Sequence, residues 1–260
     1  MGGVPQPERS GGVQSLDRAF ALLEHMSEAG GDVALSELAA RSGLPLPTIH
    51  RIVRTLVTSG YVRQLPSRRY ALGPRLIGLG EAASRMLGAW ARPQLVELVE
   101  QAGETANLAM LDGDAVVYLA QVPSKHSMRM FTEVGRRVPV HCTGVGKALL
   151  AQLPPPDAHA LLARTGLAAQ TPHTITDPER LARELERIRV QGYAVDDAEQ
   201  ELGVRCVAVA VPGGPPTTGL SVSGPDTRMT WLAVERMVPL LQQAAAALAG
   251  HLDARRALAQ

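Results

Sequence analysis

Arginine is concentrated in one stretch of the chain that contains no acidic residue. Between Arg41 and Arg75 the sequence has seven arginines and neither aspartate nor glutamate. Because each arginine that contacts a phosphate releases condensed counterions, an acid-free basic surface attracts the backbone of nucleic acid. The segment 36–56, SELAARSGLPLPTIHRIVRTL, overlaps this stretch and has the pattern of a helix-turn-helix. The two features together predict a DNA-binding segment.

The second helix of this pattern is expected to carry the contacts with bases. An α-helix fits the major groove of DNA, where arginine can donate two hydrogen bonds to guanine O6 and N7. Arginines at the tip of the hairpin that follows are expected to hold phosphate or the minor groove. The residues predicted to contact DNA are Pro47, Thr48, His50, Arg51, Arg54, Arg68 and Arg69. The alternative is a winged helix that docks protein, with the arginines forming a solvated face.

His141, Cys142 and Cys206 are the residues whose types suggest metal binding or catalysis. The adjacent His-Cys pair lacks the spaced Cys-x-x-Cys pattern of structural zinc sites. Cys206 could act as a nucleophile with His141 as its base, but no orienting partner or oxyanion motif accompanies them. We therefore expect no metal ion, no cofactor and no enzyme activity. A catalytic role stays open as an alternative, because a missing motif does not exclude it.

Three helices are expected to position the arginine-rich surface. Ser15 is predicted to cap the first helix, and Ser36 is predicted to cap a short second helix. Gly43 then supplies the turn, and the third helix is expected to begin at Pro47 or Thr48, since proline is accepted in a first helical turn. The inner face of the third helix is predicted to consist of Ile49, Ile52, Val53 and Leu56.

A hairpin and a linker follow these helices. Residues 61–64 and 69–72 alternate like two strands around an arginine-rich tip, so the whole pattern is a winged helix-turn-helix. The segment after it has leucine and alanine on one helical stripe. The predicted boundaries are 1–12 for a disordered lead-in, 13–74 for the DNA-binding domain, 75–91 for a linker helix and 92–260 for a second domain.

The second domain is expected to mix strands and helices. Residues 107–111 and 115–122 flank Asp112-Gly113-Asp114, which is a hairpin signal. Further strands are expected at 128–132, 204–211 and 218–222. Helices are expected at 93–101, 146–153, 156–164, 178–190 and 231–252. A mixture of this kind, closed by a long helix, is typical of an α+β sensor domain.

Charge is distributed unevenly along the 260 residues. Residues 1–88 hold ten arginines and seven acidic residues, whereas acidic residues outnumber basic ones in the remainder. A basic head on a mildly acidic body indicates that only the head meets nucleic acid. No stretch has the layout of a signal peptide or the apolar length of a membrane span. A soluble, cytoplasmic, nucleoid-associated protein with no membrane partner is therefore expected.

Several motifs resemble the isocitrate lyase regulator (IclR) family of bacterial transcription factors. In the DNA-binding half they are GVQSLDRA at 12–19, LPLPTIHR at 44–51 and YALGPRL at 70–76. In the second domain they are HCTGVGKALLA at 141–151, GYAVDDAEQELGVRC at 192–206 and LSVSGP at 220–225. The resemblance covers essentially residues 12–250. Pro47 departs from it, because the family usually has serine there and the hydroxyl could reach phosphate.

The resemblance implies a GAF-like effector-binding domain, and dimers or tetramers assembled through the winged helix and linker. It places the effector pocket at Gly144, Val145, Gly146, Asp196, Cys206, Ser221 and Ser223. Glycines before a helix expose backbone N–H groups to a carboxylate, and alternate serines on a strand face the same side. Asp196 would accept hydrogen bonds from a ligand hydroxyl, and the Cys206 thiol would donate weakly. Taken singly, each residue also fits an ordinary turn, strand or core position.

Shorter motifs look closest to the allantoin-repressor branch of that family. They are GETANLA at 103–109, SMRM at 127–130 and TGLAAQTP at 165–172. That branch senses glyoxylate and other intermediates of purine breakdown. Glyoxylate or allantoate is therefore the expected effector, because hydrated glyoxylate offers hydroxyls from which Asp196 can accept hydrogen bonds.

These observations predict a homodimeric or tetrameric, ligand-responsive repressor that binds double-stranded operator DNA. Two winged helices would bind a pseudo-palindromic operator whose half-sites lie about 34 Å apart, or a multiple of that distance. One alternative is an activator, or a regulator of another carbon catabolic pathway whose ligand strengthens DNA binding. Another alternative is a small-molecule-binding or catalytic protein whose winged helix docks protein.

Overall fold

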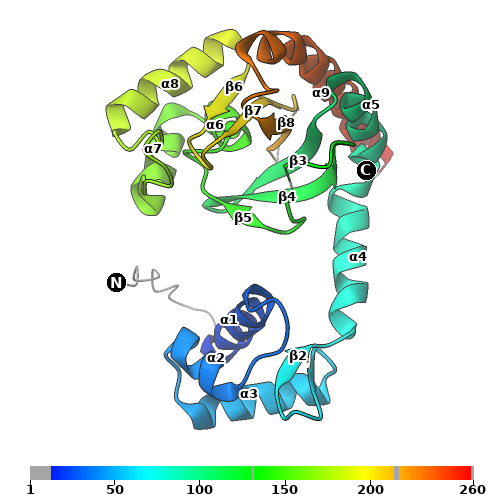
Figure 1. Cartoon of the computed structure of the whole chain (residues 1–260), viewed down its shortest axis with the longest axis vertical. Helices are drawn as coiled ribbons and strands as arrows, with labels where there is room; N and C mark the ends of the chain where they lie inside the picture. The colour runs from blue at the N-terminus through cyan, green and yellow to red at the C-terminus, as the bar shows by residue number, and fades with distance from the viewer. Residues whose placement is uncertain (1–12, 131, 214–216, 259–260) are drawn as a thin grey trace. The chain divides into compact units, whose positions relative to one another are not determined.

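The computed structural model describes residues 13–130, 132–213 and 217–258. The expected disordered lead-in, residues 1–12, lies outside the described residues. The chain divides into two compact units, Met1–Ala83 and Ser84–Gln260, and helix α4 (Arg75–Leu87) contains the boundary between them (Figure 1). The domain boundaries given above stay predictions.

The first unit is a three-helix domain with a two-stranded hairpin. Its elements are α1 (Gln14–Glu28), α2 (Leu35–Ser42), α3 (Leu46–Thr58), β1 (Val62–Gln64) and β2 (Tyr70–Leu72). The strands are antiparallel, with Val62 opposite Leu72. The core contains Leu22, Met26, Val33, Leu38, Ile49, Ile52, Val53, Leu56 and Val62. The winged helix-turn-helix and the inner face of its third helix are confirmed.

Two helices begin earlier than the predicted capping serines imply. Helix α1 begins at Gln14 rather than after Ser15, and α2 begins at Leu35 rather than after Ser36. At α2 the cap is made from the first turn instead, because the Glu37 carboxylate accepts a hydrogen bond from the backbone N–H just before the helix (3.2 Å). A carboxylate in the first turn also lies favourably at the positive end of the helix dipole.

The helix-turn-helix turn and the start of α3 follow from glycine and proline. Gly43 has a φ of 67°, a left-handed conformation that glycine adopts without strain. Pro45 precedes α3 and Pro47 is its second residue, so α3 begins at Leu46, slightly before the predicted start. Proline has no N–H that needs an acceptor in a first turn, which explains how α3 begins without a side-chain cap.

The second unit is built on one antiparallel sheet. Its strands are β3 (Thr105–Asp112), β4 (Ala115–Val122), β5 (Arg137–Val138), β6 (Ala194–Asp197), β7 (Val204–Ala210) and β8 (Thr218–Pro225). Their order across the sheet is β5-β4-β3-β8-β7-β6. The helical elements are η1 (Ala89–Ala91), α5 (Arg92–Ala102), α6 (Gly144–Leu150), α7 (Pro155–Thr165), α8 (Pro178–Gln191) and α9 (Trp231–Leu258). Among the described residues, no helix has both the length and the apolar character that a membrane span requires.

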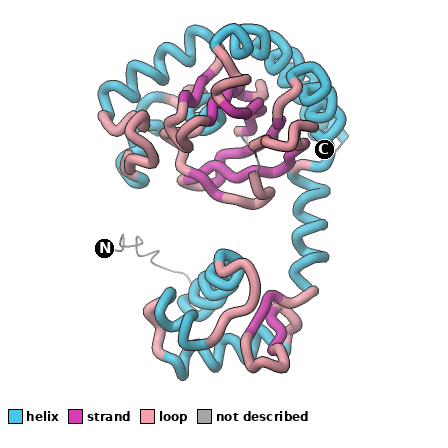
Figure 2. The backbone as a smooth tube through the Cα atoms, in the orientation of Figure 1, coloured by secondary structure: helices cyan, strands magenta, loops and turns pink. Residues whose placement is uncertain are grey.

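Helices cover both faces of this sheet (Figure 2). One apolar cluster joins α5 and α9 to one face and includes Leu95, Val207 and Leu241. A second cluster joins α6, α7 and α8 to the other face and includes Leu149 and Ala208. Since Val207 and Ala208 are consecutive, the alternation of side chains along β7 separates the two clusters. The α+β fold class is thereby confirmed.

Three details of the second unit differ from the prediction. The expected strand at 128–132 is absent from its described residues, and Met128 is 75% exposed without a strand partner. Residue 131 of that segment lies outside the described residues. The short strands β5 and β6 were not predicted, because two to four residues give too little alternation to recognise. The hairpin of β3 and β4 and the strand β7 are confirmed.

Candidate DNA-binding surface and effector site

Helix α3 presents one exposed polar face. Pro47, His50, Arg51 and Arg54 follow the i, i+3, i+4, i+7 spacing, so they lie on the same side of the helix. All four are exposed, and Thr48 at the edge of this face is half-buried. The opposite side of α3 is buried in the core of the unit. The predicted recognition residues therefore share one accessible surface.

Three of the arginines predicted to contact DNA, two on α3 and one on the hairpin, are free to bind an anion. Arg51, Arg54 and Arg68 form no ion pair with any other residue in the described part of the chain. Arg68 is exposed at the tip of the hairpin, with a φ of 62°. An unpaired exposed guanidinium keeps its donors for phosphate or for a base edge.

Arg69, beside Arg68, has a different environment. Its Nε donates to Asp32 Oδ1 at 2.9 Å, and its terminal nitrogens donate to both Glu37 carboxylate oxygens at 3.1 and 2.9 Å. The hydrogen bonds to Glu37 and Asp32 raise the pKa of Arg69, and the same contact with Arg69 lowers the pKa of Glu37. Arg69 thus ties the hairpin to the start of α2. Because its charge is already paired, a phosphate would have to compete with Asp32 and Glu37 for Arg69, and its DNA contact stays a prediction.

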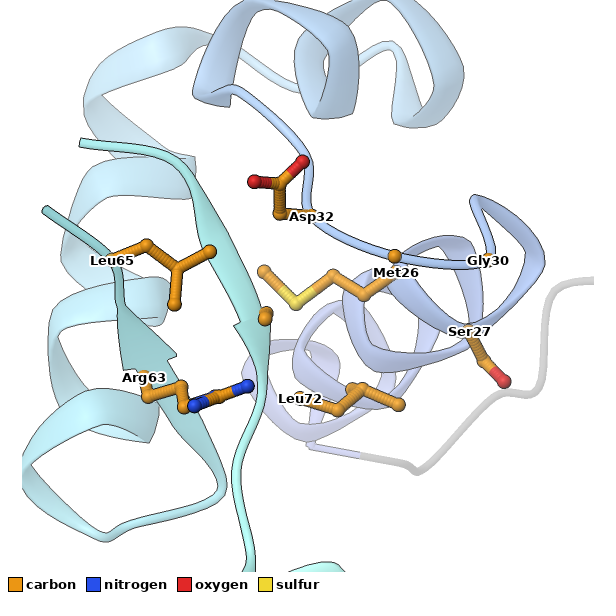
Figure 3. A pocket seen from close by; sticks show the side chains of 9 residues that line it. Met26, Ser27, Gly30, Asp32, Arg63, Leu65 and Leu72 are labelled. Atoms are coloured by element: carbon orange, nitrogen blue, oxygen red, sulfur yellow. The ribbon is translucent and has the colours of Figure 1, made fainter. Parts of the chain in front are cut away.

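A cavity of about 460 Å³ lies between the end of α1 and the hairpin (Figure 3). Arg63, Leu65 and Leu72 line it from the hairpin side, and Met26 and Asp32 line it from α1 and the following loop. None of the residues predicted to contact DNA lines it. It is therefore separate from the exposed face of α3.

The second unit brings the predicted effector residues together on one face of its sheet. Asp196 on β6 is paired with Cys206 on β7, and Cys206 is paired with Ser223 on β8. Ser221 lies two residues before Ser223, so its side chain points to the same side. All four residues are buried. Strand register thus assembles residues that are far apart in the sequence.

Helix α6 packs directly on this face. Thr143 precedes the helix, and its Oγ1 accepts a hydrogen bond from the Gly146 N–H at 3.2 Å. A methyl group on Gly144 would lie 3.0 Å from Cys206 Sγ, and one on Gly146 would overlap the carbonyl oxygen of Val140. The helix begins at Gly144, earlier than predicted, because Thr143 supplies the cap. Gly144 thus allows the helix to approach the sheet closely, and Gly146 allows it to pack against the segment that precedes it.

Val145, between these glycines, is buried in the core under α6. The Val145 side chain occupies the space that a methyl group on Gly219 would need, so this side chain belongs to the packing between α6 and β8. Only its backbone is left to meet a ligand, as predicted for a turn that exposes N–H groups.

The Asp196 carboxyl is held by the backbone that follows it. Its Oδ1 accepts hydrogen bonds from the N–H groups of Glu199 at 2.7 Å and Gln200 at 3.3 Å. Burial raises the pKa of Asp196 from 3.8 to about 7, although the Glu199 N–H acts in the opposite direction. Asp196 can therefore accept or donate a hydrogen bond near neutral pH.

Burial also raises the pKa of the Cys206 thiol to about 12, and the neighbouring Asp196 carboxyl adds to this effect. The thiol is consequently protonated at neutral pH and lacks the thiolate that a nucleophile needs. His141, the base considered above, has a pKa lowered by burial. Among the described residues, no group of three or more His, Cys, Asp and Glu side chains suits a metal ion.

Two residues near this site were not identified from the sequence. Burial raises the pKa of Tyr118, and Cys206 and Asp196 add to the shift, which places the Tyr118 hydroxyl in the same electrostatic environment. Lys147 on α6 is 1% exposed, and its Nζ donates to the Val195 carbonyl at 2.6 Å and to the Glu199 carboxylate. A lysine inside the apolar run VGKALLA was the available signal for the latter.

A winged helix with unpaired arginines, followed by a domain with a buried polar site, defines a transcriptional regulator with an effector-binding domain. Residues 15–66 match the family model described as the IclR helix-turn-helix domain. Residues 82–249 match the model described as the bacterial transcriptional regulator IclR C-terminal. The chain belongs to the IclR family.

Two relatives are repressors from Escherichia coli strain K12. The chain is 40% identical over 228 residues to the transcriptional repressor IclR, covering 85% of this chain and 83% of the relative. It is 33% identical over 233 residues to the repressor AllR, covering 88% and 86%. Because identity is higher with IclR than with AllR, the comparisons do not single out the allantoin-repressor branch.

Two solved structures are similar to most of this chain. The IclR transcriptional regulator from Alicyclobacillus acidocaldarius has a TM-score of 0.82 and 33% identity, covering 92% of this chain and 98% of that one. An IclR homologue from Microbacterium hydrocarbonoxydans, solved with 4-hydroxybenzoate, has a TM-score of 0.79 and 26% identity, covering 92% and 99%. The latter protein holds a small carboxylic acid.

Proposed function

We propose that this protein is a repressor that binds operator DNA and is released from it by a small acid. The observation that carries the proposal is the buried polar row of Asp196, Cys206 and Ser223 directly under α6. The Asp196 carboxyl in this row is already oriented by two backbone N–H groups, as a preorganised site for a small ligand requires. The repressor activity of two relatives and the unpaired arginines of α3 support the same reading.

The DNA-binding form is proposed to be a homodimer, or a tetramer built from dimers. Val13, Leu16 and Phe20 are exposed along α1 at helical spacing, with exposed fractions of 60, 55 and 62%. An apolar stripe of this kind suits contact with a second copy of the chain. Two copies would then present their α3 helices to the two halves of a pseudo-palindromic operator.

The effector is proposed to be glyoxylate or allantoate. Its carboxylate would face the first turn of α6 and the hydroxyls of Ser221 and Ser223. Its hydroxyl or amide groups would face Asp196, whose pKa of about 7 permits either direction of hydrogen bonding. Effector binding releases DNA only if the effector prefers the DNA-free state.

Fluorescence anisotropy tests this proposal with the full-length protein and labelled DNA from upstream of its own and neighbouring genes. The titration is repeated with glyoxylate, allantoate, allantoin and pyruvate. Release by glyoxylate or allantoate is the expected result. Tight binding unchanged by all four would discard this effector class, and tighter binding would reverse the sign of regulation. No binding to any of these fragments would favour the protein-docking alternative.

A further inference from the structure

The loop after β6 has an unusual backbone. Ala198 has a φ of 58°, in the left-handed region that residues other than glycine rarely adopt. Such a conformation persists only where the surroundings hold it. The next two residues, Glu199 and Gln200, direct their N–H groups at Asp196 Oδ1. The placement of the Asp196 carboxyl therefore depends on the shape of this loop.

Side chains from a neighbouring segment hold the same loop. Thr171 Oγ1 donates to the Ala198 carbonyl at 2.7 Å, and Thr174 Oγ1 donates to the Glu199 carbonyl at 2.6 Å. Cys142, just before α6, donates its thiol hydrogen to Gln200 Oε1 at 3.0 Å. Ala198, Glu199 and Gln200 thus each have a partner outside the loop.

Lys147 connects the loop to α6. Its Nζ donates to Glu199 Oε1, and the other oxygen, Oε2, has no hydrogen-bond partner among the described residues. The side chains of Lys147 and Glu199 are 1% and 8% exposed. The Glu184 carboxylate on α8 lies farther from Nζ, at 3.8 Å. Lys147 is therefore the hydrogen-bonding anchor of the Glu199 carboxylate.

A buried ion pair of this kind contributes little to stability compared with apolar side chains of similar volume. What it does supply is a fixed geometry between two elements. Here the two elements are α6, whose Gly144 packs against Cys206, and the loop, whose N–H groups hold Asp196. Lys147 and Glu199 lie behind the candidate effector residues: the Glu199 N–H holds Asp196, and the Lys147–Glu199 ion pair is not itself one of the proposed ligand contacts.

We infer that Lys147 and Glu199 are a positioning pair that fixes Asp196 relative to α6 for effector binding. The inference rests on the proposed function of the Asp196 site. Loss of the pair should let the loop relax from the Ala198 conformation, so that Asp196 no longer meets an effector in the right orientation. Basal operator binding, which uses α3, should be unaffected.

The main test is the double variant Lys147→Met/Glu199→Met in the full-length protein. It removes the pair without leaving a buried charge unpaired. We expect the dissociation constant for glyoxylate, measured by calorimetry, to rise at least tenfold, which corresponds to about 1.4 kcal/mol. Operator affinity without glyoxylate should stay within threefold of wild type, and the melting temperature should change little.

Two matched variants separate positioning from general damage. Glu199→Gln keeps an oxygen that accepts from Lys147 but removes the charge nearest to it, so it should lower the melting temperature while glyoxylate affinity stays within threefold. Glu184→Gln changes the second carboxylate near Lys147. Glu184 accepts a hydrogen bond from Arg187 on its own helix, so this variant should also have little effect on glyoxylate affinity. A double variant that binds glyoxylate like wild type would overturn the inference. A double variant that does not fold would assign the pair to the fold and overturn it as well.

A ligand-free measurement distinguishes failure of this inference from failure of the proposed effector. Cys142 is fully buried and bonded to Gln200, so its modification by a thiol reagent, located by mass spectrometry, reports opening of the loop. We expect at least tenfold faster modification in the double variant. If wild type does not bind glyoxylate, faster modification still supports the positioning role, and an unchanged rate overturns it.

Discussion

The two units present their candidate binding residues in opposite ways. In the winged helix, Arg51 and Arg54 are close in sequence, exposed and unpaired within the described residues. In the second unit, Asp196 and Cys206 come from different strands, are buried, and have partners inside the protein. A surface that attracts a polyanion needs free charge, whereas a site for one small molecule needs groups that are already oriented.

The largest expected difference between the two sites is their response to salt. If the dimer neutralises about six phosphates, the logarithm of operator affinity should fall against the logarithm of salt concentration with a slope near −5. Between 50 and 200 mM salt this is a loss of about a thousandfold. Anisotropy titrations at several salt concentrations measure this dependence of operator affinity on salt. Glyoxylate affinity, which we expect to vary little with salt, is the comparison. Operator affinity that does not change with salt would contradict both this difference between the two sites and the predicted phosphate contacts.

Asp196→Ala should produce the next largest effect. It removes the carboxyl expected to meet the effector, so release of DNA by glyoxylate should need at least about a hundredfold more ligand, because a buried partner group is left unpaired. Operator affinity in the absence of ligand should remain within threefold of wild type. Normal release of this variant from DNA would move the effector site elsewhere in the second unit.

Arg51→Ala should weaken specific operator binding by about 1–3 kcal/mol, or roughly tenfold to a hundredfold. Non-specific DNA binding should fall much less, because a base contact carries sequence information and a phosphate contact does not. Competition titrations with operator and scrambled DNA separate the two. Equal losses on both DNAs would make Arg51 a phosphate contact.

The raised pKa of Asp196 predicts how stability depends on pH. Its pKa is about 7 in the folded protein and 3.8 as the ordinary value, so between these the folded state binds more protons than the unfolded state. The contribution of Asp196 to the free energy of unfolding is fully present below about pH 4. It is lost as pH rises through 7, at no more than about 1.4 kcal/mol per pH unit. Denaturant unfolding of wild type and Asp196→Asn checks it. The variant should lack this component, and parallel profiles would contradict it.

Arg68 and Arg69 provide the smallest and most direct comparison. Arg68→Ala should reduce the magnitude of the salt slope by about one for each copy of the chain, since the variant removes one predicted phosphate contact from each copy. Arg69→Ala should leave the slope almost unchanged and lower the melting temperature of the first unit only slightly, because its ion pairs are exposed. Anisotropy and thermal unfolding distinguish the two. Equal changes in slope would support Arg69 as a DNA contact.

The sequence was most informative where local pattern alone decides structure. The apolar spacing of Ile49, Ile52 and Val53 and the glycine turn at Gly43 were sufficient to place α3. Helix starts were less accurate, because a carboxylate of the first turn replaced the expected serine cap at α2, and α3 begins one residue before the predicted proline. No local pattern indicates that Arg69 meets Asp32, 37 residues away.

The effector residues were found through family motifs rather than through local physics. Strand register brings Asp196 beside Cys206, and β6, with four residues, was too short to predict. The apolar run around Lys147 indicates only that this lysine is unusual and does not identify its partner. The burial of Lys147 depends on Glu199, 52 positions further along the chain, and such pairings become visible only in the fold.

The close approach of α6 to the sheet has a consequence for redesigning this protein as a metabolite biosensor. Gly144 and Gly146 have no room for an added methyl group without displacing the helix or its cap. Mutant libraries that aim at new analytes should therefore leave these two codons unchanged and diversify the strand positions Ser221 and Ser223. Substitutions at these serines leave the packing of α6 against Cys206 and its Thr143 cap in place.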